Sequence, residues 1–586
     1  MSELASSLGP RGQVRHAPAV KPDEADAAAR RGHMLLVAAL GVGTLLRLVH
    51  YAARPSLLID EARVALDVGS RDWVGLLRPL DYDQTAPILF LWAERLATRL
   101  AGVNEHALRA LPFLAGIAAL PLLLLIARRL LGVVAATLAV SIAAVSPQLI
   151  QYSGEVKPYS LDLAITLGLV WLALEVRDAP QNIARRRRLA LGGLLAIWAS
   201  APAAFTLAAI GGALMVAPPK ARLRYRFVLG TSCLWAASFA LAYAIVYAPA
   251  AKSPYMRQFW QGSLLRILEP GLTARAWHGI RETVWQLFVG GTTDPPLGRP
   301  ESLLATIGAA ALVLVGLAGA RRIQRAAGWD GLLVTIGPFL AGVAASLVGG
   351  YPVAARVMTY AATSLVLPVA GGCIALAESM GATPRGALAL VSACVLVSPL
   401  PRDIALATRP NGLENVRAAV SEFERLARPG EPIYVFAATL PAWTFYTTDW
   451  TAPDTVRLAR MARLGSSGGP AFENAPPRRR AIRDEGDSLV YQYGGRPEII
   501  GLFHGAQWRS ATGPVQHHAD TNWTTNEARR IRAAALPEAW VLVSHSHALE
   551  RFLVPAVEAL GGHVVESYKA DGARLWKFRF APDPLR

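Results

Sequence analysis

Charged residues are scarce in this chain: they make up 17% of its 586 residues, whereas hydrophobic residues make up 53%. So little charge argues against an ordinary soluble enzyme and favours a polytopic membrane protein. Cysteine is rare too, and Cys233, Cys373 and Cys394 fall inside apolar segments at no metal-ligand spacing, so neither a disulfide framework nor a zinc site is indicated. The sequence also lacks a basic domain with interleaved aromatic residues, which argues against nucleic-acid binding despite the formal charge of +17.

Long apolar runs are what the chain does have. A run of about 17 to 25 apolar residues can cross a bilayer as a helix. The longer run 189–217 is interrupted by Ser200-Ala201-Pro202, and a proline there predicts two short helices. With these two, about eleven spans are expected. The others are 34–53, 107–127, 131–150, 159–177, 227–248, 302–320, 331–349, 357–377 and 386–404.

The segment 86–101 is predicted to lie along the membrane surface as a juxtamembrane helix. Its apolar residues recur at helical spacing and its charged residues occupy the other side, which is typical of an interfacial helix. The two sets are Leu89, Trp92, Leu96 and Leu100, and Glu94, Arg95 and Arg99.

This assignment of 86–101 decides the sidedness of the chain. With the N-terminus in the cytoplasm, the Arg-rich turns between spans all fall on the cytoplasmic side, as the positive-inside rule requires. The extracytoplasmic side then receives the acidic loop 54–106, the turn 152–159, the loop 249–301 and the turn 349–356. We expect these four segments to share one cavity.

Composition divides the chain into three parts. Residues 1–33 are rich in Ala, Pro and Arg without an apolar core, which predicts a disordered cytoplasmic tail. Residues 34–404 form the transmembrane part. In 405–586 helical spacing at 411–427 alternates with a strand pattern at 432–437, which predicts a soluble extracytoplasmic α/β domain. The fold class is therefore mainly α, a polytopic membrane protein with a C-terminal α/β domain.

Asp60-Glu61, just past the first span, is the principal candidate for catalysis. A carboxylate at a membrane boundary can act as a general base toward an acceptor hydroxyl when partial burial tunes its pKa. The alternative is a helix start, because acidic residues are common at the N-cap and in the first turn. Asp81 and Asp83 leave a similar choice open between a turn or cap and a substrate contact. Two further acidic residues are assigned to the solvated face of a helix, Asp67 and Asp72.

The turn between Tyr152 and Tyr159 is a candidate for anion binding. It places Glu155 and Lys157 between two spans, and polar groups at this depth are functional candidates. Lys157 could bind a phosphate as a point charge, with Tyr159 donating a hydrogen bond. The alternative is a lysine that snorkels beside interfacial tyrosines.

Arg356, in the turn that begins at Tyr351, breaks the positive-inside trend and so indicates an anionic ligand. Arg47 and His50 lie near the outer end of the first span. They are interpreted as snorkelling side chains.

Taken in order, these motifs resemble the GT-C membrane glycosyltransferases. The pattern comprises Asp60-Glu61 after the first span, a Pro-led amphipathic helix that closes the loop, the turn Tyr152 to Tyr159, and Tyr351-Pro352 followed by Arg356. It is most similar to the bacterial relatives of the dolichyl-phosphate-mannose protein mannosyltransferases, glycosyltransferase family 39, which include the lipid A aminoarabinose transferases. The likeness covers about residues 34 to 404.

The resemblance implies an inverting transfer of a hexosyl or pentosyl group from a polyprenyl-phosphate carrier to a lipid, glycan or protein acceptor. The reaction would take place outside a bacterial inner membrane, in the cell envelope. Asp60 would be the base and Glu61 its companion, and Lys157 and Arg356 would hold the carrier phosphate. The other residues assigned to substrate or phosphate binding are Tyr159, Glu155, Asp81, Asp83 and Tyr351.

Two departures from the family pattern bear on this assignment. Lys157 stands where Arg is more common, and Thr85-Ala86-Pro87 stands where His-Pro-Pro is frequent. No metal is required by the scheme, and no cofactor is expected, although the acidic loop leaves a divalent ion open.

Two other classes of function remain as alternatives. A transporter or flippase for lipid-linked sugars would call for inverted repeats or mid-membrane ionisable residues, which the sequence does not clearly show. A membrane-anchored binding or assembly protein would do its work through residues 405–586.

Overall fold

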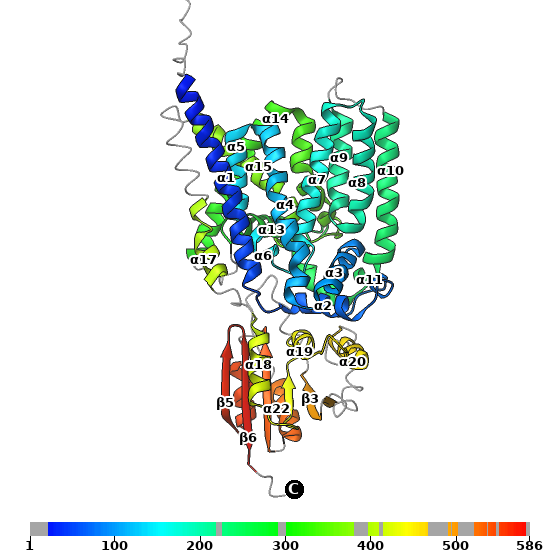
Figure 1. The fold of residues 1–586 in the computed structure, drawn as a ribbon, viewed down its shortest axis with the longest axis vertical. Helices are drawn as coiled ribbons and strands as arrows, with labels where there is room; N and C mark the ends of the chain where they lie inside the picture. The colour runs from blue at the N-terminus through cyan, green and yellow to red at the C-terminus, as the bar shows by residue number, and fades with distance from the viewer. Residues whose placement is uncertain are drawn as a thin grey trace, which may run out of the picture.

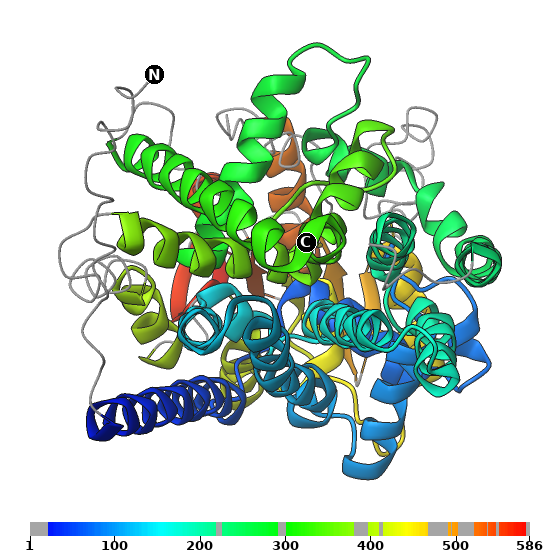
Figure 2. The ribbon, with the colours of Figure 1, turned by 90° about the horizontal axis from the view of Figure 1, so that it is seen from above.

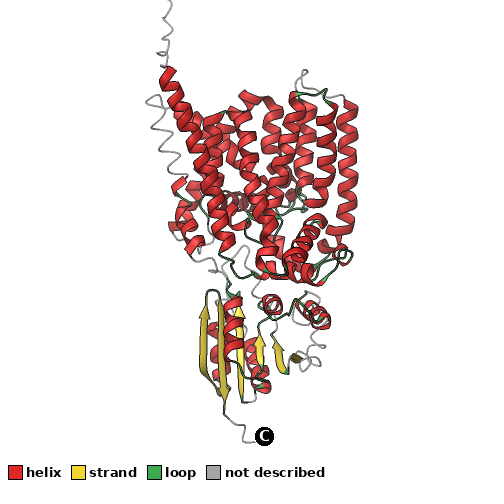
Figure 3. Ribbon diagram, viewed as in Figure 1, coloured by secondary structure: helices red, strands yellow, loops and turns green. Residues whose placement is uncertain are grey.

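The structure is a computed structural model that describes residues 22–217, 225–290, 300–379, 396–408, 414–466, 490–493, 495–501, 521–535, 537–545 and 550–581. Helices form most of the molecule, and a small domain that contains the strands lies at one end of them (Figures 1 and 3). The predicted fold class is confirmed: a mainly α-helical protein with apolar helices and a C-terminal α/β domain.

In the described part of the chain, 6 helices are long and apolar enough to cross a membrane. One of them lies within α14, which is broken at Gly328, where φ is 76°. Its two halves correspond to the spans expected at 302–320 and 331–349. Seen from above, α1 lies at the periphery of the bundle (Figure 2). The six helices lie in α1 (Pro22–Ala52), α4 (Glu105–Leu131), α7 (Tyr159–Asp178), α10 with η2 (Tyr225–Ala242 and Tyr243–Tyr247), α14 (Pro300–Leu347) and η4 with α15 (Thr359–Ala361 and Thr363–Ser379).

The run 189–217 forms two short helices, as Pro202 predicts. The chain turns at Ser200, between α8 (Ile183–Ala199) and α9 (Ala203–Val216). The expected span 131–150 is likewise divided, into α5 (Val133–Ala144) and α6 (Pro147–Tyr152). Proline at the first position of α6 explains the division, because it lacks the N–H that a continuous helix needs.

Two expected boundaries fall inside helices. The tail expected over 1–33 is wrong from residue 22 onward, because α1 begins at Pro22. A proline at the first helical position, followed by Asp23 and Glu24 and then by several alanines, favours a helix start there. The boundary at 404 falls inside α17 (Leu400–Thr408), and most of the expected span 386–404 lies outside the described residues.

The loop 249–301 contains helices of its own rather than extended chain. The π-helical turn η2 (Tyr243–Tyr247) leads into it from α10. The elements within it are α11 (Ala248–Ala251), α12 (Pro254–Trp260), η3 (Gln261–Ser263) and α13 (Leu272–Phe288).

The acidic loop forms α2 (Ile59–Ser70), η1 (Gly75–Leu77) and α3 (Ile88–Ala101), and α2 and α3 lie at the end of the bundle that carries the sheet domain (Figure 1). In α3 Glu94 and Arg95 are buried, while Arg99, Leu96 and Leu100 are exposed. That the exposed leucines face lipid stays a prediction.

The C-terminal domain is built on a six-stranded sheet with the order β2-β3-β1-β4-β6-β5. The central strands β3, β1 and β4 are parallel, and Tyr434 of β1 pairs with Ile499 and Val541 on either side. The remaining pairs are antiparallel. The strands are β1 (Ile433–Val435), β2 (Val490–Tyr493), β3 (Arg496–Ile500), β4 (Glu538–Ser544), β5 (Gly562–Ala570) and β6 (Ala573–Phe580); the helices are α18 (Val416–Leu426), α19 (Leu440–Tyr446), α20 (Thr455–Gly465), α22 (Thr521–Ala534) and α23 (Glu550–Glu558).

One hydrophobic core joins the two parts of the molecule. Buried side chains of α2 and α3, such as Val64 and Phe90, belong to the same cluster as Phe423, Trp443 and Trp540 of the C-terminal domain. The transmembrane helices have their own clusters. The acidic loop is therefore packed as a layer between the bundle and the sheet domain.

Candidate active site

Glu61 lies in the first turn of α2 and is fully buried. Its carboxylate accepts four hydrogen bonds: from Leu58 N (2.9 Å), from Val156 N (2.8 Å), and from Arg109 Nε (2.9 Å) and Nη2 (2.8 Å). One side chain thus holds together the start of α2, the helix α4 and the turn that carries Lys157. For Glu61 the helix-start interpretation of the motif describes what its side chain does.

Asp60, one residue earlier, presents its carboxylate to a group of cations. It pairs with Arg356 Nη1 at 3.0 Å and with Arg63 Nη1 at 3.7 Å, and about a third of its side chain is exposed. Burial alone would raise the pKa of Asp60, but the charges of Lys157, Arg356 and Arg63 outweigh it and hold that pKa well below its usual range. Asp60 therefore remains a carboxylate throughout the physiological pH range.

Arg356 is held over two aromatic rings. Its guanidinium carbon lies 5.0 Å from the ring centre of Phe259 and 4.8 Å from that of Trp260, at the end of α12. Stacking on aromatic faces fixes the plane of the guanidinium without using its hydrogen-bond donors. The loop 249–301 therefore orients the guanidinium of Arg356 through Phe259 and Trp260. This contact joins two of the four segments that were expected to share a cavity.

Lys157 is buried, and its Nζ donates to Gln84 Oε1 at 2.7 Å. Burial lowers the pKa of Lys157, an effect that the nearby charge of Asp60 opposes. Snorkelling is therefore the wrong interpretation for this lysine, because its ammonium group is enclosed by the acidic loop. Gln84 is a site residue that the sequence prediction missed, because that prediction rested on charged residues and the amide of Gln84 is neutral. Its position beside Asp83 was the one available signal.

Glu155, in the same turn, accepts a hydrogen bond from Gln151 Nε2 at 2.8 Å. Burial and the neighbouring charge of Glu61 raise the pKa of Glu155 to about 8. Tyr159, at the start of α7, packs edge to face on Tyr152 with the ring centres 4.9 Å apart and interacts electrostatically with Arg356. The structure thus brings Glu155 and Tyr159 together with Asp60, Lys157 and Arg356.

Tyr351 has a different surrounding. Its hydroxyl donates to the carbonyl of Val357 at 2.8 Å, and its ring packs against Phe205 and Tyr360. These contacts hold the turn that presents Arg356. A direct contact of Tyr351 with a phosphate stays a prediction, and its visible contribution is to the shape of the turn.

Asp81 and Asp83 stand in a turn with two consecutive left-handed residues, Tyr82 at φ 55° and Asp83 at φ 57°. Asp81 pairs with Arg71 at 2.8 Å, and Asp83 Oδ1 accepts from Ser253 Oγ at 2.8 Å. Asp83 therefore contacts the loop 249–301, whereas Asp81 pairs within the acidic loop, and both are separate from the ion pair of Asp60 with Arg356.

Asp67 is not on a solvated face, as the sequence pattern predicted. It is buried, pairs with Arg71 at 2.7 Å and accepts from the backbone N–H of Asp81 at 3.0 Å. The C-terminal domain covers this side of α2, since Trp450 packs directly on Gly69. An isolated helix pattern could not reveal that cover.

The C-terminal domain also fastens the segment that leads to Asp60. Glu414 Oε2 accepts from Ile59 N at 2.9 Å, and the other oxygen of Glu414 pairs with His545 Nδ1. Tyr446 OH accepts from Leu57 N at 2.7 Å. His545 follows the carboxyl end of β4, so the carboxyl edge of the parallel strands points at the start of α2.

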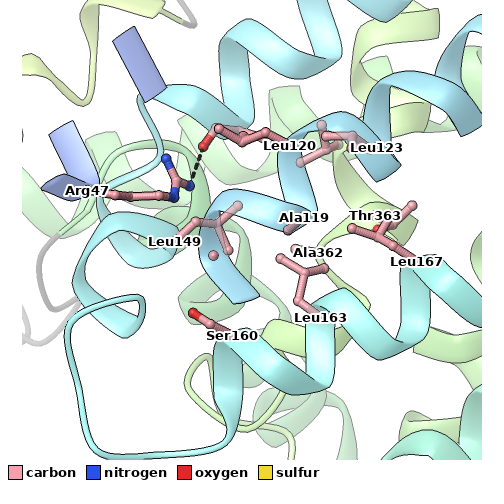
Figure 4. Close-up of a pocket in the computed structure, with 13 residues that line it drawn as sticks. Arg47, Ala119, Leu120, Leu123, Leu149, Ser160, Leu163, Leu167, Ala362 and Thr363 are labelled. Carbon is pink, nitrogen blue, oxygen red and sulfur yellow. Dashed lines mark hydrogen bonds between the residues drawn. The ribbon is translucent and has the colours of Figure 1, made fainter. Parts of the chain in front are cut away.

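Arg47 and His50 do not snorkel; both are buried. Arg47 donates to the carbonyls of Ala143 (3.0 Å) and Ala144 (3.3 Å), which are at the end of α5 and have no partner within that helix. Figure 4 shows Arg47 at one end of a small, otherwise mostly apolar pocket. His50 packs so closely on Gly154 that a Cβ there would lie 2.3 Å from its ring.

Among the residues that the structure describes, no group of three or more His, Cys, Asp or Glu side chains gathers as a metal site would. The cations of Lys157, Arg356 and Arg63 supply the positive charge around Asp60. The protein part of the site can therefore bind an anion with its own side chains.

Comparison with known proteins agrees with this chemistry. Residues 85–246 match the family model described as dolichyl-phosphate-mannose-protein mannosyltransferase. The matched segment contains the turn of Lys157, whereas Asp60 and Arg356 lie outside it. The match supports a membrane glycosyltransferase, as the motifs predicted, and it does not favour a flippase. No curated protein matches the chain in sequence.

Several solved structures resemble the chain at low identity. ArnT from Cupriavidus metallidurans bound to undecaprenyl phosphate is 13% identical with a TM-score of 0.48, over 92% of this chain and 97% of that one. The apo state of the same protein gives 14% and 0.48, over 94% and 98%. The Archaeoglobus fulgidus oligosaccharyltransferase in complex with Zn and sulfate gives 13% and 0.44, over 70% and 61%. These values describe a distant likeness of fold and assign no residue or ligand to this chain.

Proposed function

We propose that this protein is an inverting glycosyltransferase that moves a hexosyl or pentosyl group from a polyprenyl-phosphate carrier to a lipid, glycan or protein acceptor. The observation that carries the proposal is the convergence of one ionised carboxylate, Asp60, with Lys157, Arg356 and Arg63 in a chain whose residues 85–246 match the mannosyltransferase family. Residues 34–404 are the proposed catalytic part. The N-terminus is cytoplasmic, and the domain 405–586 lies outside a bacterial inner membrane.

The proposed chemistry needs a cation site and a base. As the acceptor oxygen forms its bond to the anomeric carbon, the bond from that carbon to the carrier phosphate breaks and the phosphate takes up the electron pair. Lys157 and Arg356 stabilise the charge that develops on the leaving phosphate. Asp60 takes the proton from the acceptor hydroxyl. The acceptor attacks from the face opposite the phosphate, so the configuration inverts.

Beside the cations, the pKa of Asp60 lies well below its usual range, which keeps the carboxylate ionised but makes it a weak base while it is paired with Arg356. Arg356 pairs with Asp60 in the structure, so a bound phosphate competes for the same guanidinium. Binding of the donor would loosen the ion pair and free Asp60 for the acceptor.

The test is the replacement of Asp60 by Asn in the purified full-length protein. The donor is a labelled polyprenyl-phosphate sugar, and the acceptor is a lipid and glycan extract of cells that lack the gene. Loss of a general base is expected to lower transfer by about 10²- to 10⁴-fold.

Asp72→Asn is the matched control, because Asp72 lies in the same loop and its side chain accepts from the backbone N–H of Gly75, at 2.6 Å, a bond that Asn can keep. Wild-type turnover by Asp60→Asn would overturn the proposed base. Movement of the intact lipid-linked sugar across proteoliposomes without any transfer would favour the flippase instead.

A further inference from the structure

A cavity of about 230 Å³ lies beside the cation site. Its walls come from three parts of the chain: the acidic loop from Leu76 to Leu91, the segment from Ile245 to Ser253, and Ser466 of the C-terminal domain. Gln84 lines the cavity, and the Oε1 of the same side chain accepts from Lys157. The cavity and the proposed phosphate site therefore share a side chain.

The walls of the cavity differ in chemistry from the cation site. Its lining includes the oxygen-bearing side chains of Asp81, Asp83, Gln84, Thr85 and Ser253. These offer mostly hydrogen-bond acceptors. The same lining includes the aliphatic side chains of Leu76, Leu80, Leu91, Ile245 and Val246.

Two irregular pieces of backbone meet at this cavity. The turn that carries Asp81 and Asp83 contains two residues in the left-handed conformation, Tyr82 and Asp83. This conformation is costly for residues other than glycine. Ile245 and Val246 lie on the π-helical turn η2, and such turns occur preferentially at functional sites. Both irregularities shape the walls of the same space.

We infer that this cavity binds a sugar ring, and that this ring belongs to one of the two substrates of the proposed transfer. A lining that combines carboxylate, amide and hydroxyl oxygens with aliphatic side chains suits the hydroxyl groups and the C–H face of a sugar. A phosphate suits this lining poorly, because two carboxylates line the cavity while Lys157, Arg356 and Arg63 do not; Arg78 is the cation in its lining. The inference rests on the proposed function for the identity of the substrates, but not for the binding of the ring.

Two sources of the ring are consistent with this chemistry: the donor sugar next to its phosphate, or a sugar of the acceptor. Ser466 belongs to the C-terminal domain and accepts from the backbone N–H of Tyr82 at 3.0 Å, so that domain closes the cavity and fixes its turn. A ring of either source would contact both parts of the molecule.

The first experiment measures binding without turnover. Saturation-transfer NMR of the purified full-length protein is recorded with a panel of methyl glycosides of hexoses and pentoses. We expect at least one glycoside to bind, and Val246→Trp, which fills the cavity, to abolish its signal. Leu241→Trp is the matched control, because Leu241 lies on α10 in an exposed position and does not line the cavity. Failure of every glycoside to bind, or an unchanged signal in Val246→Trp, overturns the inference.

The second experiment distinguishes the sources. Asp83→Asn keeps the shape of the side chain and removes its charge, so that a hydrogen bond from a sugar hydroxyl to this side chain is weakened. The expected result is a rise of roughly tenfold or more in one KM, that of the donor or that of the acceptor. An unchanged inhibition constant for polyprenyl phosphate without a sugar is expected at the same time.

A rise in that inhibition constant equal to the rise in KM would mean that the cavity holds the carrier, and would overturn the inference. Unchanged KM values for both substrates would overturn it as well. Binding of a glycoside by a protein that shows no transfer would instead overturn the proposed function and leave the sugar site in place. Melting temperatures of Val246→Trp, Leu241→Trp and Asp83→Asn verify that these variants are folded.

Discussion

Asp60 and Glu61 are adjacent carboxylates for which the structure predicts different main effects of the loss of charge. In Glu61→Gln, one of the two oxygens becomes an amide nitrogen, which would face the N–H groups that now donate to that oxygen. Arg109 would keep its contacts with the carbonyls of Pro55 and Ser56 but lose its anionic partner while it stays buried. Removing one partner of a buried ion pair costs about 3 to 5 kcal/mol.

The cost should appear as stability, because Glu61 fastens α2, α4 and the turn of Lys157 to one another. We expect Glu61→Gln to melt at a clearly lower temperature than the wild type in detergent. Asp60→Asn leaves Arg356 and Arg63 without their carboxylate, so it should melt somewhat below the wild type, by less than Glu61→Gln, and lose transfer while it is folded. The smaller loss is expected because the side chain of Asp60 is partly exposed.

The measurement is a thermal melt followed by tryptophan fluorescence, together with a transfer assay well below the melting temperature. A Glu61→Gln protein with wild-type stability and no transfer would refute this reasoning, because it would give Glu61 a part in the chemistry. An Asp60→Asn protein that is unfolded at the assay temperature would also refute this reasoning.

Two further predictions concern the contacts around α2. Glu414→Ala leaves the N–H of Ile59 unsatisfied, at a cost of about 1 to 3 kcal/mol, so kcat should fall. Glu414→Gln can still accept that hydrogen bond and should recover part of kcat. Glu422→Gln on α18 is the control, and equal kcat values for the wild type and the three variants would contradict the role of this contact. Burial raises the pKa of Asp67 to about 8, which is above the pKa of the same carboxyl in the unfolded chain. The protonated side chain therefore stabilises the folded protein at acidic pH, and this stability is lost as pH rises through 8. The free energy of unfolding of the wild type and of Asp67→Asn should be measured from pH 4 to 9. It should decline with pH in the wild type alone, with a slope of up to about 1.4 kcal/mol per pH unit. Parallel stability curves for the two proteins would contradict this prediction.

Local sequence patterns were sufficient to predict much of the helical architecture. The apolar runs predicted the long helices, Pro202 predicted the break between α8 and α9, and the amphipathic segment 86–101 predicted α3 beside the acidic loop. Each of these features depends on residues that are close in sequence. Positions such as Asp60, Lys157 and Arg356 stood out because charge is rare at the ends of apolar helices.

What the sequence could not predict depends on distant partners. Glu61 is held by Arg109 and Val156, which are 48 and 95 residues away, and Ile59 is held by Glu414, 355 residues away. Asp67 is buried by a domain that begins more than 300 residues later. No periodicity within α2 contains this information, so the local pattern could not show that Glu61 holds α2 to α4 or that Asp67 is buried.

The shared core of the acidic loop and the C-terminal domain also sets an order of events in biosynthesis. Val64 and Phe90 are made early, but the cluster that buries them includes Phe578 and Phe580 near the end of the chain. The segment around Asp60 must therefore wait, with its apolar side uncovered, until almost the whole protein has been synthesised. A chain that stops before the C-terminal domain would lack these partners, so the apolar side of α2 and α3 would stay uncovered.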